Sequence, residues 1–210
     1  MASPRIENGI VVGTSGAKYD SKNPLAVHLL REFDRVISEL AAHAAPKSIL
    51  EVGCGEGHII KLLLDNTSAP ILATDLSESV LDDARQAISS DRVTFRTADI
   101  MEIDPVEPAP DLVVCCEVLE HLPDPQGGLE ALQRQRANWY ILSVPREPIW
   151  RLLNMARGAY LRDFGNSPGH LQHWSQREFL KFIGQAFEPV IIRAPLPWTV
   201  VLCRPHDRPA

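Results

Sequence analysis

Residues 48–58 read S-I-L-E-V-G-C-G-E-G-H, a short apolar run that breaks directly into three glycines. The run from Ser48 to Val52 is apolar and partly β-branched, which is typical of a buried parallel strand. Apolar residues recur from His58 to Leu64 and predict a helix. Glycines between a strand and a helix allow positive φ angles and close approach of a ligand, while the start of the helix offers unpaired N–H groups. This stretch therefore predicts a nucleotide-type binding loop.

The spacing of the glycines argues against a dinucleotide site. The fingerprint G-x-G-x-x-G would need a glycine at position 58, where this chain has a histidine. The sequence E-V-G-C-G-E-G resembles motif I of class I S-adenosylmethionine (SAM) dependent methyltransferases, in which the loop faces the methionine half of the cofactor. The resemblance implies SAM contacts from Glu51, Gly53, Cys54, Gly55 and Gly57, with Glu51 meeting the ammonium group directly or through water.

A carboxylate ends the second strand that the sequence predicts, at residues 70–74. Asp75 follows Gly57 by 18 residues, and nucleoside-binding α/β folds place an acid about 20 residues beyond the glycines to bind the ribose hydroxyls. The alternative is a helix cap, although Ser77 already fits that role. We therefore expect Asp75, with the adjacent Leu76, to contact the cofactor.

A second acid follows the third predicted strand, at residues 92–96. In the resembling family an Asp at this place binds the adenine amine, and a neighbouring backbone N–H binds the ring. The resemblance assigns these roles to Asp99 and Ile100. A simple turn residue is the alternative for Asp99.

Residues 111–122, D-L-V-V-C-C-E-V-L-E-H-L, predict a fourth buried strand and the polar turn after it. This segment closely resembles the subfamily that includes ubiquinone-biosynthesis O-methyltransferases and many small-molecule methyltransferases. Because function in open α/β sheets gathers at the carboxyl ends of the strands, we expect Glu117 to contact the cofactor. His121 is the leading candidate for a general base, since imidazole titrates near neutral pH. The alternative is that His121 only shapes the pocket.

The chain beyond Pro145 predicts an insertion after a fifth strand at residues 138–144. Apolar and arginine residues alternate with helical spacing over 149–162, and a loop rich in Gly, Asn, His and Trp follows. His170 and His173 in this loop are rival candidates for catalysis. Their His-x-x-His spacing suits a metal, but no third ligand is apparent, so we expect no metal.

The ends of the chain complete the prediction. An amphipathic helix is expected over 24–45, and the resemblance implies that it and the preceding segment cap the cofactor, with Tyr19 closing over SAM. An ordinary surface aromatic is the alternative for Tyr19. The first dozen residues are expected to fray. A helix from Ser175 and two strands are expected to close the sheet.

These segments predict one α/β domain in the 210-residue chain. The expected fold is a Rossmann-like, seven-stranded, mostly parallel sheet flanked by helices, with the last strand antiparallel. Its expected parts follow the chain: an N-terminal cap (1–45), a SAM-binding core (46–144), an acceptor lid (145–174), and a C-terminal helix and hairpin (175–204).

Charge is distributed unevenly along the chain. The net charge of −6 argues against nucleic-acid binding, yet residues 131–210 carry 11 basic against 5 acidic side chains. The simpler explanation is two differently solvated faces, and the other is an anionic acceptor near this segment.

Without a membrane-length apolar run or a signal-peptide pattern, a cytoplasmic location is expected. Four cysteines without C-x-x-C spacing argue against a zinc site or a disulfide framework.

The resemblance implies transfer of a methyl group from SAM to a small-molecule acceptor, preferentially at oxygen, with S-adenosylhomocysteine as the product. One alternative acceptor is an isoprenoid or lipid, because the arginine-flanked apolar face at 149–162 could contact an anionic membrane weakly. Another alternative is a non-catalytic nucleotide-binding protein. The sequence leaves open the acceptor, its reacting atom and the oligomeric state.

Overall fold

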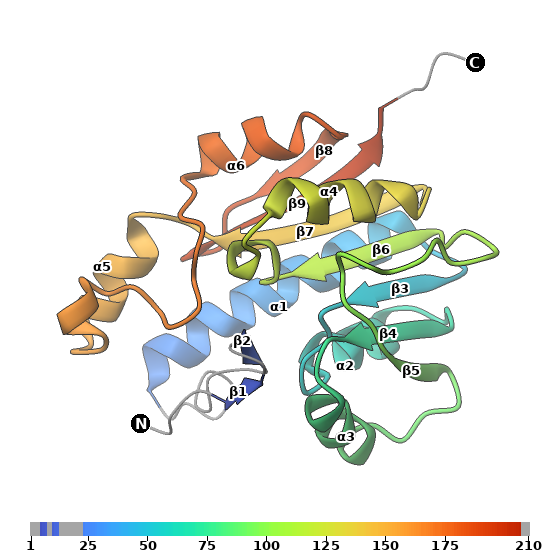
Figure 1. The fold of residues 1–210 in the computed structure, drawn as a ribbon, viewed down its shortest axis with the longest axis horizontal. Helices are drawn as coiled ribbons and strands as arrows, with labels where there is room; N and C mark the ends of the chain where they lie inside the picture. The colour runs from blue at the N-terminus through green and yellow to red at the C-terminus, as the bar shows by residue number, and fades with distance from the viewer. Residues whose placement is uncertain (1–4, 8–9, 13–22, 207–210) are drawn as a thin grey trace.

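A computed structural model describes residues 5–7, 10–12 and 23–206 of the chain. Its main feature is a seven-stranded sheet with helices on both faces, in the strand order β5-β4-β3-β6-β7-β9-β8 (Figure 1). The strands of this sheet are β3 (Ile49–Val52), β4 (Ile71–Asp75), β5 (Val93–Thr97), β6 (Leu112–Cys116), β7 (Trp139–Pro145), β8 (Phe187–Arg193) and β9 (Trp198–Pro205). The helices are α1 (Pro24–Ala44), α2 (His58–Asn66), α3 (Glu78–Ala87), α4 (Pro125–Arg134), α5 (Ile149–Ala156) and α6 (Gln176–Ile183), with short 3-10 turns η1 (Leu119–His121) and η2 (Leu161–Asp163).

The pairing of the strands confirms the predicted Rossmann-like fold. Strands β3 to β7 pair in parallel, whereas β9 lies between β7 and β8 and is antiparallel to both. The parallel strands therefore deliver their carboxyl ends to one edge of the sheet, where ligands of open α/β folds bind.

Alternating side chains of the strands build one hydrophobic core on each face of the sheet. Ile49 packs with the face covered by α1, α2 and α3, whereas its neighbour Leu50 packs with the face covered by α4 and α6. Leu112 and Val113 in β6 divide in the same way. Strands buried on both faces explain why these segments appear as continuous apolar runs in the sequence.

Two sequence predictions of local structure are wrong. Residues expected to fray include a small antiparallel pair, β1 (Arg5–Glu7) with β2 (Ile10–Val12). The helix expected over 149–162 ends at Ala156, because Gly158 takes a φ of +73° and Tyr160 a φ of +53°. Such left-handed residues break an α-helix, so the remaining part folds separately as η2.

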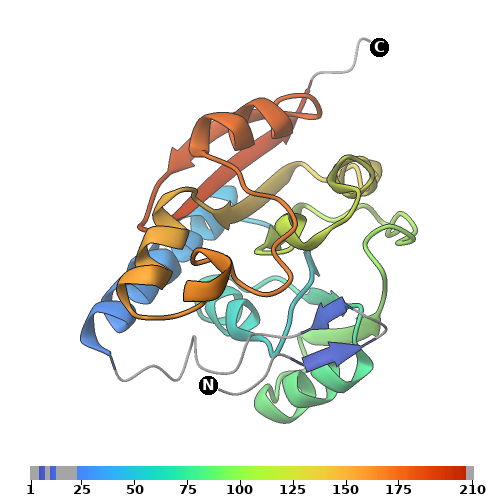
Figure 2. The ribbon, with the colours of Figure 1, turned by 60° about the vertical axis from the view of Figure 1, so that its left-hand side comes forward.

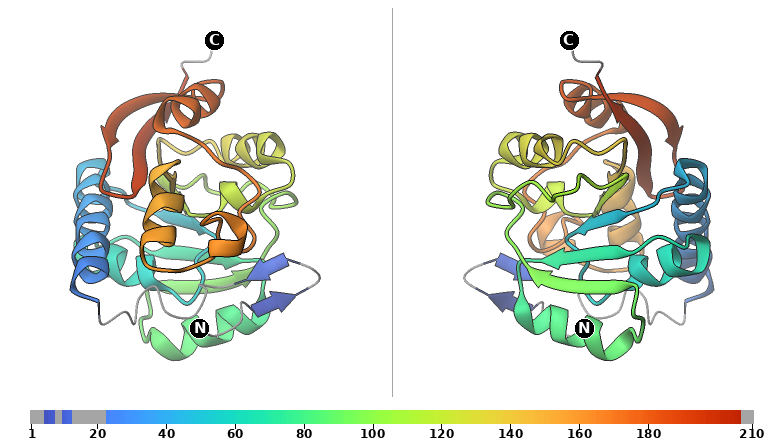
Figure 3. Two further views of the ribbon diagram at one scale, coloured as in Figure 1. Left: turned by 90° about the vertical axis from the view of Figure 1, so that its left-hand side faces the viewer. Right: turned by 90° about the vertical axis from the view of Figure 1, so that its right-hand side faces the viewer.

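Helix α5, η2 and the loop that leads to α6 form the insertion after β7. Figures 2 and 3 show this orange segment in front of the carboxyl ends of the parallel strands. We call residues 145–174 the lid segment, and its position places it over the edge where the glycine loop lies. No helix within the described residues is both long and apolar enough to cross a membrane.

Candidate active site

The glycine loop between β3 and α2 has the backbone geometry expected of a ligand cradle. Gly53 and Gly57 have φ angles of +76° and +85°, and a Cβ on Gly53 would lie 2.3 Å from Cγ2 of Val118. The N–H groups of Gly53 and Cys54 donate to the Thr74 carbonyl, at 2.8 and 2.9 Å, which ties the loop to the end of β4. The loop is therefore fixed against β4 before any ligand binds.

Glu51 places a buried carboxylate under this loop. Its side chain is 2% exposed, and Oε2 has no hydrogen-bond partner among the described residues. Burial, followed by the nearby carboxylate of Asp75, raises the pKa of Glu51 well above its usual range. A buried acceptor of this kind needs a donor or a positive charge to compensate for the lost hydration.

Asp75 lies beside the loop at the end of β4. One carboxylate oxygen accepts from the Gly55 N–H at 2.9 Å and the other from the Ser77 N–H at 3.0 Å. Burial raises the pKa of Asp75, and these N–H groups partly offset the rise. Ser77 also caps α3 through its hydroxyl, so the alternative role of Asp75 as the cap is not needed. The side chain of Leu76 is 40% exposed.

Asp99 and Ile100 follow β5 at the same edge of the sheet. Asp99 Oδ1 accepts from the Met101 N–H at 2.8 Å in a local turn. Ile100 is buried in the core under α4. Their assignment to the adenine remains a prediction, and Tyr19 lies outside the described residues.

Glu117 has a different environment from Glu51. Its backbone is left-handed with a φ of +60°, and its carboxylate accepts from Trp198 Nε1 at 2.8 Å and from the Ser143 hydroxyl at 3.2 Å. The side chain therefore links β6 to β7 and β9, and its contact with a cofactor remains a prediction.

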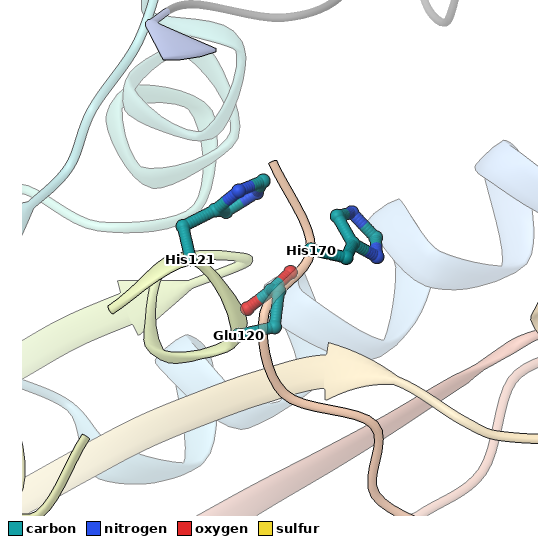
Figure 4. A group of neighbouring side chains, drawn as sticks. All are labelled: Glu120, His121 and His170. Carbon is teal, nitrogen blue, oxygen red and sulfur yellow. The ribbon is translucent and has the colours of Figure 1, made fainter. Parts of the chain in front are cut away.

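A second group of polar side chains lies where the lid segment meets η1. One ligand-capable atom from each of Glu120, His121 and His170 lies within 4.8 Å of the others (Figure 4). The rings of the two histidines meet edge to face at 4.8 Å between their centroids, and Trp150 stacks on His170 at 5.7 Å. Glu120 is buried, at 1% exposure, and both histidines are partly open.

The residues predicted to bind the cofactor fit the chemistry of SAM. The unpartnered Glu51 Oε2 suits a cationic amino group, and a Cβ on Gly55 would meet nothing within 4 Å, so the loop leaves open space there. The carboxylate of Asp75 keeps lone pairs for hydroxyl donors beyond its two backbone bonds. An α-amino acid joined to a ribose carries both kinds of donor.

Comparison with known proteins agrees with this geometry. Residues 50–135 match the family model described as a methyltransferase domain. The fold is similar to magnesium protoporphyrin IX methyltransferase from Synechocystis, crystallised with bound S-adenosylhomocysteine, with a TM-score of 0.65 at 17% identity over 88% of this chain and 89% of that one. Residues 50–135 thus match a methyltransferase domain, and the fold is similar to that of a methyltransferase.

Curated relatives of this chain are named for different reactions. A trans-aconitate 2-methyltransferase of Methylobacterium nodulans is 35% identical over 55% of this chain and 46% of its own length. A ubiquinone biosynthesis O-methyltransferase of Azotobacter vinelandii is 31% identical over 66% of this chain and 59% of its own length. The chain thus spans about half the length of these relatives.

One structural neighbour is named for nitrogen as the reacting atom. N-methyltransferase NodS from Bradyrhizobium japonicum has a TM-score of 0.64 at 18% identity, over 88% of this chain and 98% of that one. A likeness at this identity shows the fold alone. An acceptor for this chain must therefore be argued from its own residues.

The structure does not bring together the three histidines that we predicted from the sequence as candidates for catalysis. His121 and His170 lie together, but His173 bonds Asn166 Oδ1 at 2.8 Å and lines a different surface pocket with Trp174 and α6. The pairing of His170 with His173 suggested by the His-x-x-His spacing is therefore not seen.

Sequence reasoning missed Glu120 as a site residue. Its position directly before His121, after a buried strand that ends at the functional edge, was the signal that could have identified it. It also missed Trp150, whose indole N–H donates to the Ser167 hydroxyl at 2.9 Å and whose ring packs on His170.

Proposed function

We propose that this protein transfers the methyl group of SAM to a small-molecule acceptor, preferentially at oxygen, and releases S-adenosylhomocysteine. SAM supplies an electrophilic methyl group on a sulfonium. The chain must then align the acceptor and exclude water, and such positioning contributes about 7 to 11 kcal/mol in well-oriented reactions. The ubiquinone biosynthesis relative, which is named an O-methyltransferase, supports oxygen as the reacting atom.

The observation that carries this proposal is the buried, unpartnered Oε2 of Glu51 under the glycine loop. A buried carboxylate without a donor lowers stability, and a ligand that brings a cationic amino group offsets that cost. Asp75 beside it offers further acceptor capacity to a diol. A nicotinamide dinucleotide has no amino acid group to satisfy Glu51.

Binding measurements test the cofactor first. Calorimetry should show binding of SAM and S-adenosylhomocysteine and no comparable binding of NAD. Glu51→Gln removes a hydrogen bond to a charged group, which contributes about 1.5 to 3 kcal/mol, so the SAM affinity should fall about 10- to 100-fold. Asp65→Asn on the exposed end of α2 is the matched control and should bind SAM like the wild type. NAD binding with no SAM binding would reject the proposal.

A metabolite screen tests the reaction. Incubation of the protein and SAM with extracted metabolites should yield a compound heavier by one methylene group, together with S-adenosylhomocysteine. If SAM binds and no extract yields such a product, the non-catalytic alternative is favoured.

A lipid or isoprenoid acceptor is a second candidate, supported by the surface of the lid segment. Leu152, Leu161 and Phe164 are 55%, 60% and 72% exposed, and Arg157 and Arg162 are exposed among them. Apolar side chains flanked by arginines suit an anionic membrane surface. Co-sedimentation with phosphatidylglycerol vesicles but not with phosphatidylcholine vesicles would support this acceptor class. Absence of the protein from both pellets would favour a water-soluble acceptor over a lipid.

A further inference from the structure

We propose that Glu120, His121 and His170 form a binding site for one divalent transition-metal ion. Ligand atoms of these three side chains lie within 4.8 Å of one another. Atoms that share an ion at about 2.0 to 2.2 Å lie about 3 to 4 Å apart, so small side-chain rotations would close the site. In Figure 4 the carboxylate of Glu120 lies below and between the rings of His121 and His170, which come from η1 and from the lid segment.

The donor set indicates the class of metal. Two imidazole nitrogens and one carboxylate oxygen suit zinc, manganese, iron or cobalt, and they leave coordination positions for water or a substrate. Magnesium prefers oxygen ligands throughout. The sequence argument against a metal rested on His170 and His173, and the structure pairs His170 with a different set of ligands.

Hydrogen bonds between the backbones hold the two halves of the site together. The N–H groups of Leu171 and Gln172 both donate to the carbonyl of Glu120, at 2.8 and 3.0 Å. The Gln172 side chain also donates to the Leu122 carbonyl at 3.0 Å. The loop that carries His170 is therefore fixed on η1, so metal binding would need little rearrangement of the chain.

The orientation of His121 suits a metal ligand. Its Nδ1 lies 2.9 Å from the Gly169 carbonyl oxygen, which can only accept a hydrogen bond. Nδ1 therefore carries the proton, and in the neutral ring Nε2 keeps the lone pair. Histidine ligands of metals commonly donate their second ring N–H to a carbonyl or carboxylate in this way.

A role for the ion in catalysis rests on the proposed function. An acceptor hydroxyl bound to the ion at an open coordination position would have a lowered pKa. It would release its proton to solvent at a lower pH than an unbound hydroxyl, and the electron pair of the O–H bond would remain on oxygen. His121 would then act as a metal ligand and not as a general base. The partial exposure of both histidines leaves a path for the acceptor.

Metal titration tests the site without reference to turnover. Protein stripped with a chelator should bind about one equivalent of Mn²⁺ by electron paramagnetic resonance, and Co²⁺ should give visible absorption bands. Glu120→Gln and His170→Ala should each weaken Mn²⁺ binding at least tenfold. His173→Ala, on the same loop but outside the site, should bind Mn²⁺ like the wild type. Mg²⁺ should not compete at equal concentration.

Two controls make the result decisive. Thermal unfolding must show that the variants are folded, and His170→Gln serves if His170→Ala is not. SAM calorimetry on the same metal-free samples separates this proposal from the proposed function, because SAM contacts other residues. Wild-type protein that binds SAM but no Mn²⁺, or His170→Gln that binds Mn²⁺ as tightly as the wild type, would overturn the metal site.

Discussion

Glu51 shows at the residue scale how a ligand site lowers the stability of the protein that carries it. Burial and the charge of Asp75 raise its pKa, so the folded protein keeps a proton on Glu51 at pH values where the unfolded chain has released it. Stability falls with rising pH wherever the native state binds more protons. The contribution of Glu51 to unfolding free energy therefore falls as the pH rises from about 4.3 toward its raised native pKa.

Glu51→Gln should flatten this pH dependence, because glutamine does not titrate. Urea unfolding between pH 5 and 9 would show the variant gaining stability relative to the wild type as the pH rises. Asp65→Asn, on an exposed helix end, should follow the wild-type profile. An unchanged pH slope in Glu51→Gln would show that the Glu51 pKa is not raised in the folded protein.

The glycines of the loop differ in why they are needed. Gly53 combines a φ of +76° with a Cβ position 2.3 Å from Val118, whereas Gly55 has a φ of +53° and open space. Gly55→Ala should cost about 1 to 2 kcal/mol for the left-handed backbone. Gly53→Ala should cost about 1 to 3 kcal/mol more, since the stiff β-branched Val118 cannot move aside. Equal losses of unfolding free energy in urea would contradict this distinction.

At the scale of elements, the strands and the glycine loop could be predicted because their patterns are local. The apolar runs that form β3, β4 and β6 are buried on both faces, and Glu51 and Asp75 follow from their positions at strand ends. The end of α5 could not be predicted, because apolar spacing continued across Gly158. The meeting of His121 with His170 depends on a loop docking on a distant turn, which no local pattern encodes.

A buried side chain ties α5 to the loop that follows η2 in the lid segment. Asn154, 3% exposed, donates through its amide to the Gly165 carbonyl at 2.8 Å and to the Ser167 hydroxyl at 3.2 Å. Asn154→Ala leaves the buried carbonyl unpaired, which costs about 1 to 3 kcal/mol. Hydrogen exchange of residues 157–167 should therefore accelerate, and the acceptor KM should rise while SAM affinity is unchanged.

Asn66→Ala provides the comparison for this variant. Asn66 is an exposed residue at the end of α2, and its amide bonds Ser38 and the Leu62 carbonyl. Its loss should leave exchange in the lid segment at the wild-type rate. Exchange protection in Asn154→Ala equal to that of Asn66→Ala would show that the lid segment is held by other contacts.

At the scale of the whole molecule, charge separates the two parts of the chain. Residues 1–130 carry 10 basic against 22 acidic side chains, and residues 131–210 carry 11 against 5. The acidic part includes Glu51 and Asp75 beside the glycine loop, whose carboxylates suit a cationic sulfonium and ammonium. The basic part includes the lid segment, so an anionic acceptor would meet a complementary surface on approach.

An anionic acceptor predicts a salt-dependent KM. The Debye length is about 10 Å at 0.1 M salt and about 3 Å at 1 M, so added salt screens the exposed Arg157 and Arg162 from the acceptor. The KM of the acceptor found in the metabolite screen should rise several-fold over this range, with kcat unchanged. Replacing both arginines by glutamine should raise KM at low salt and remove most of the salt dependence.

The matched pair Arg134→Gln and Arg136→Gln, exposed at the far end of α4, should keep the wild-type salt response. A KM that is independent of salt in the wild type would reject charge as the basis of acceptor recognition and favour the lipid acceptor, whose vesicle binding depends on the exposed leucines and Phe164.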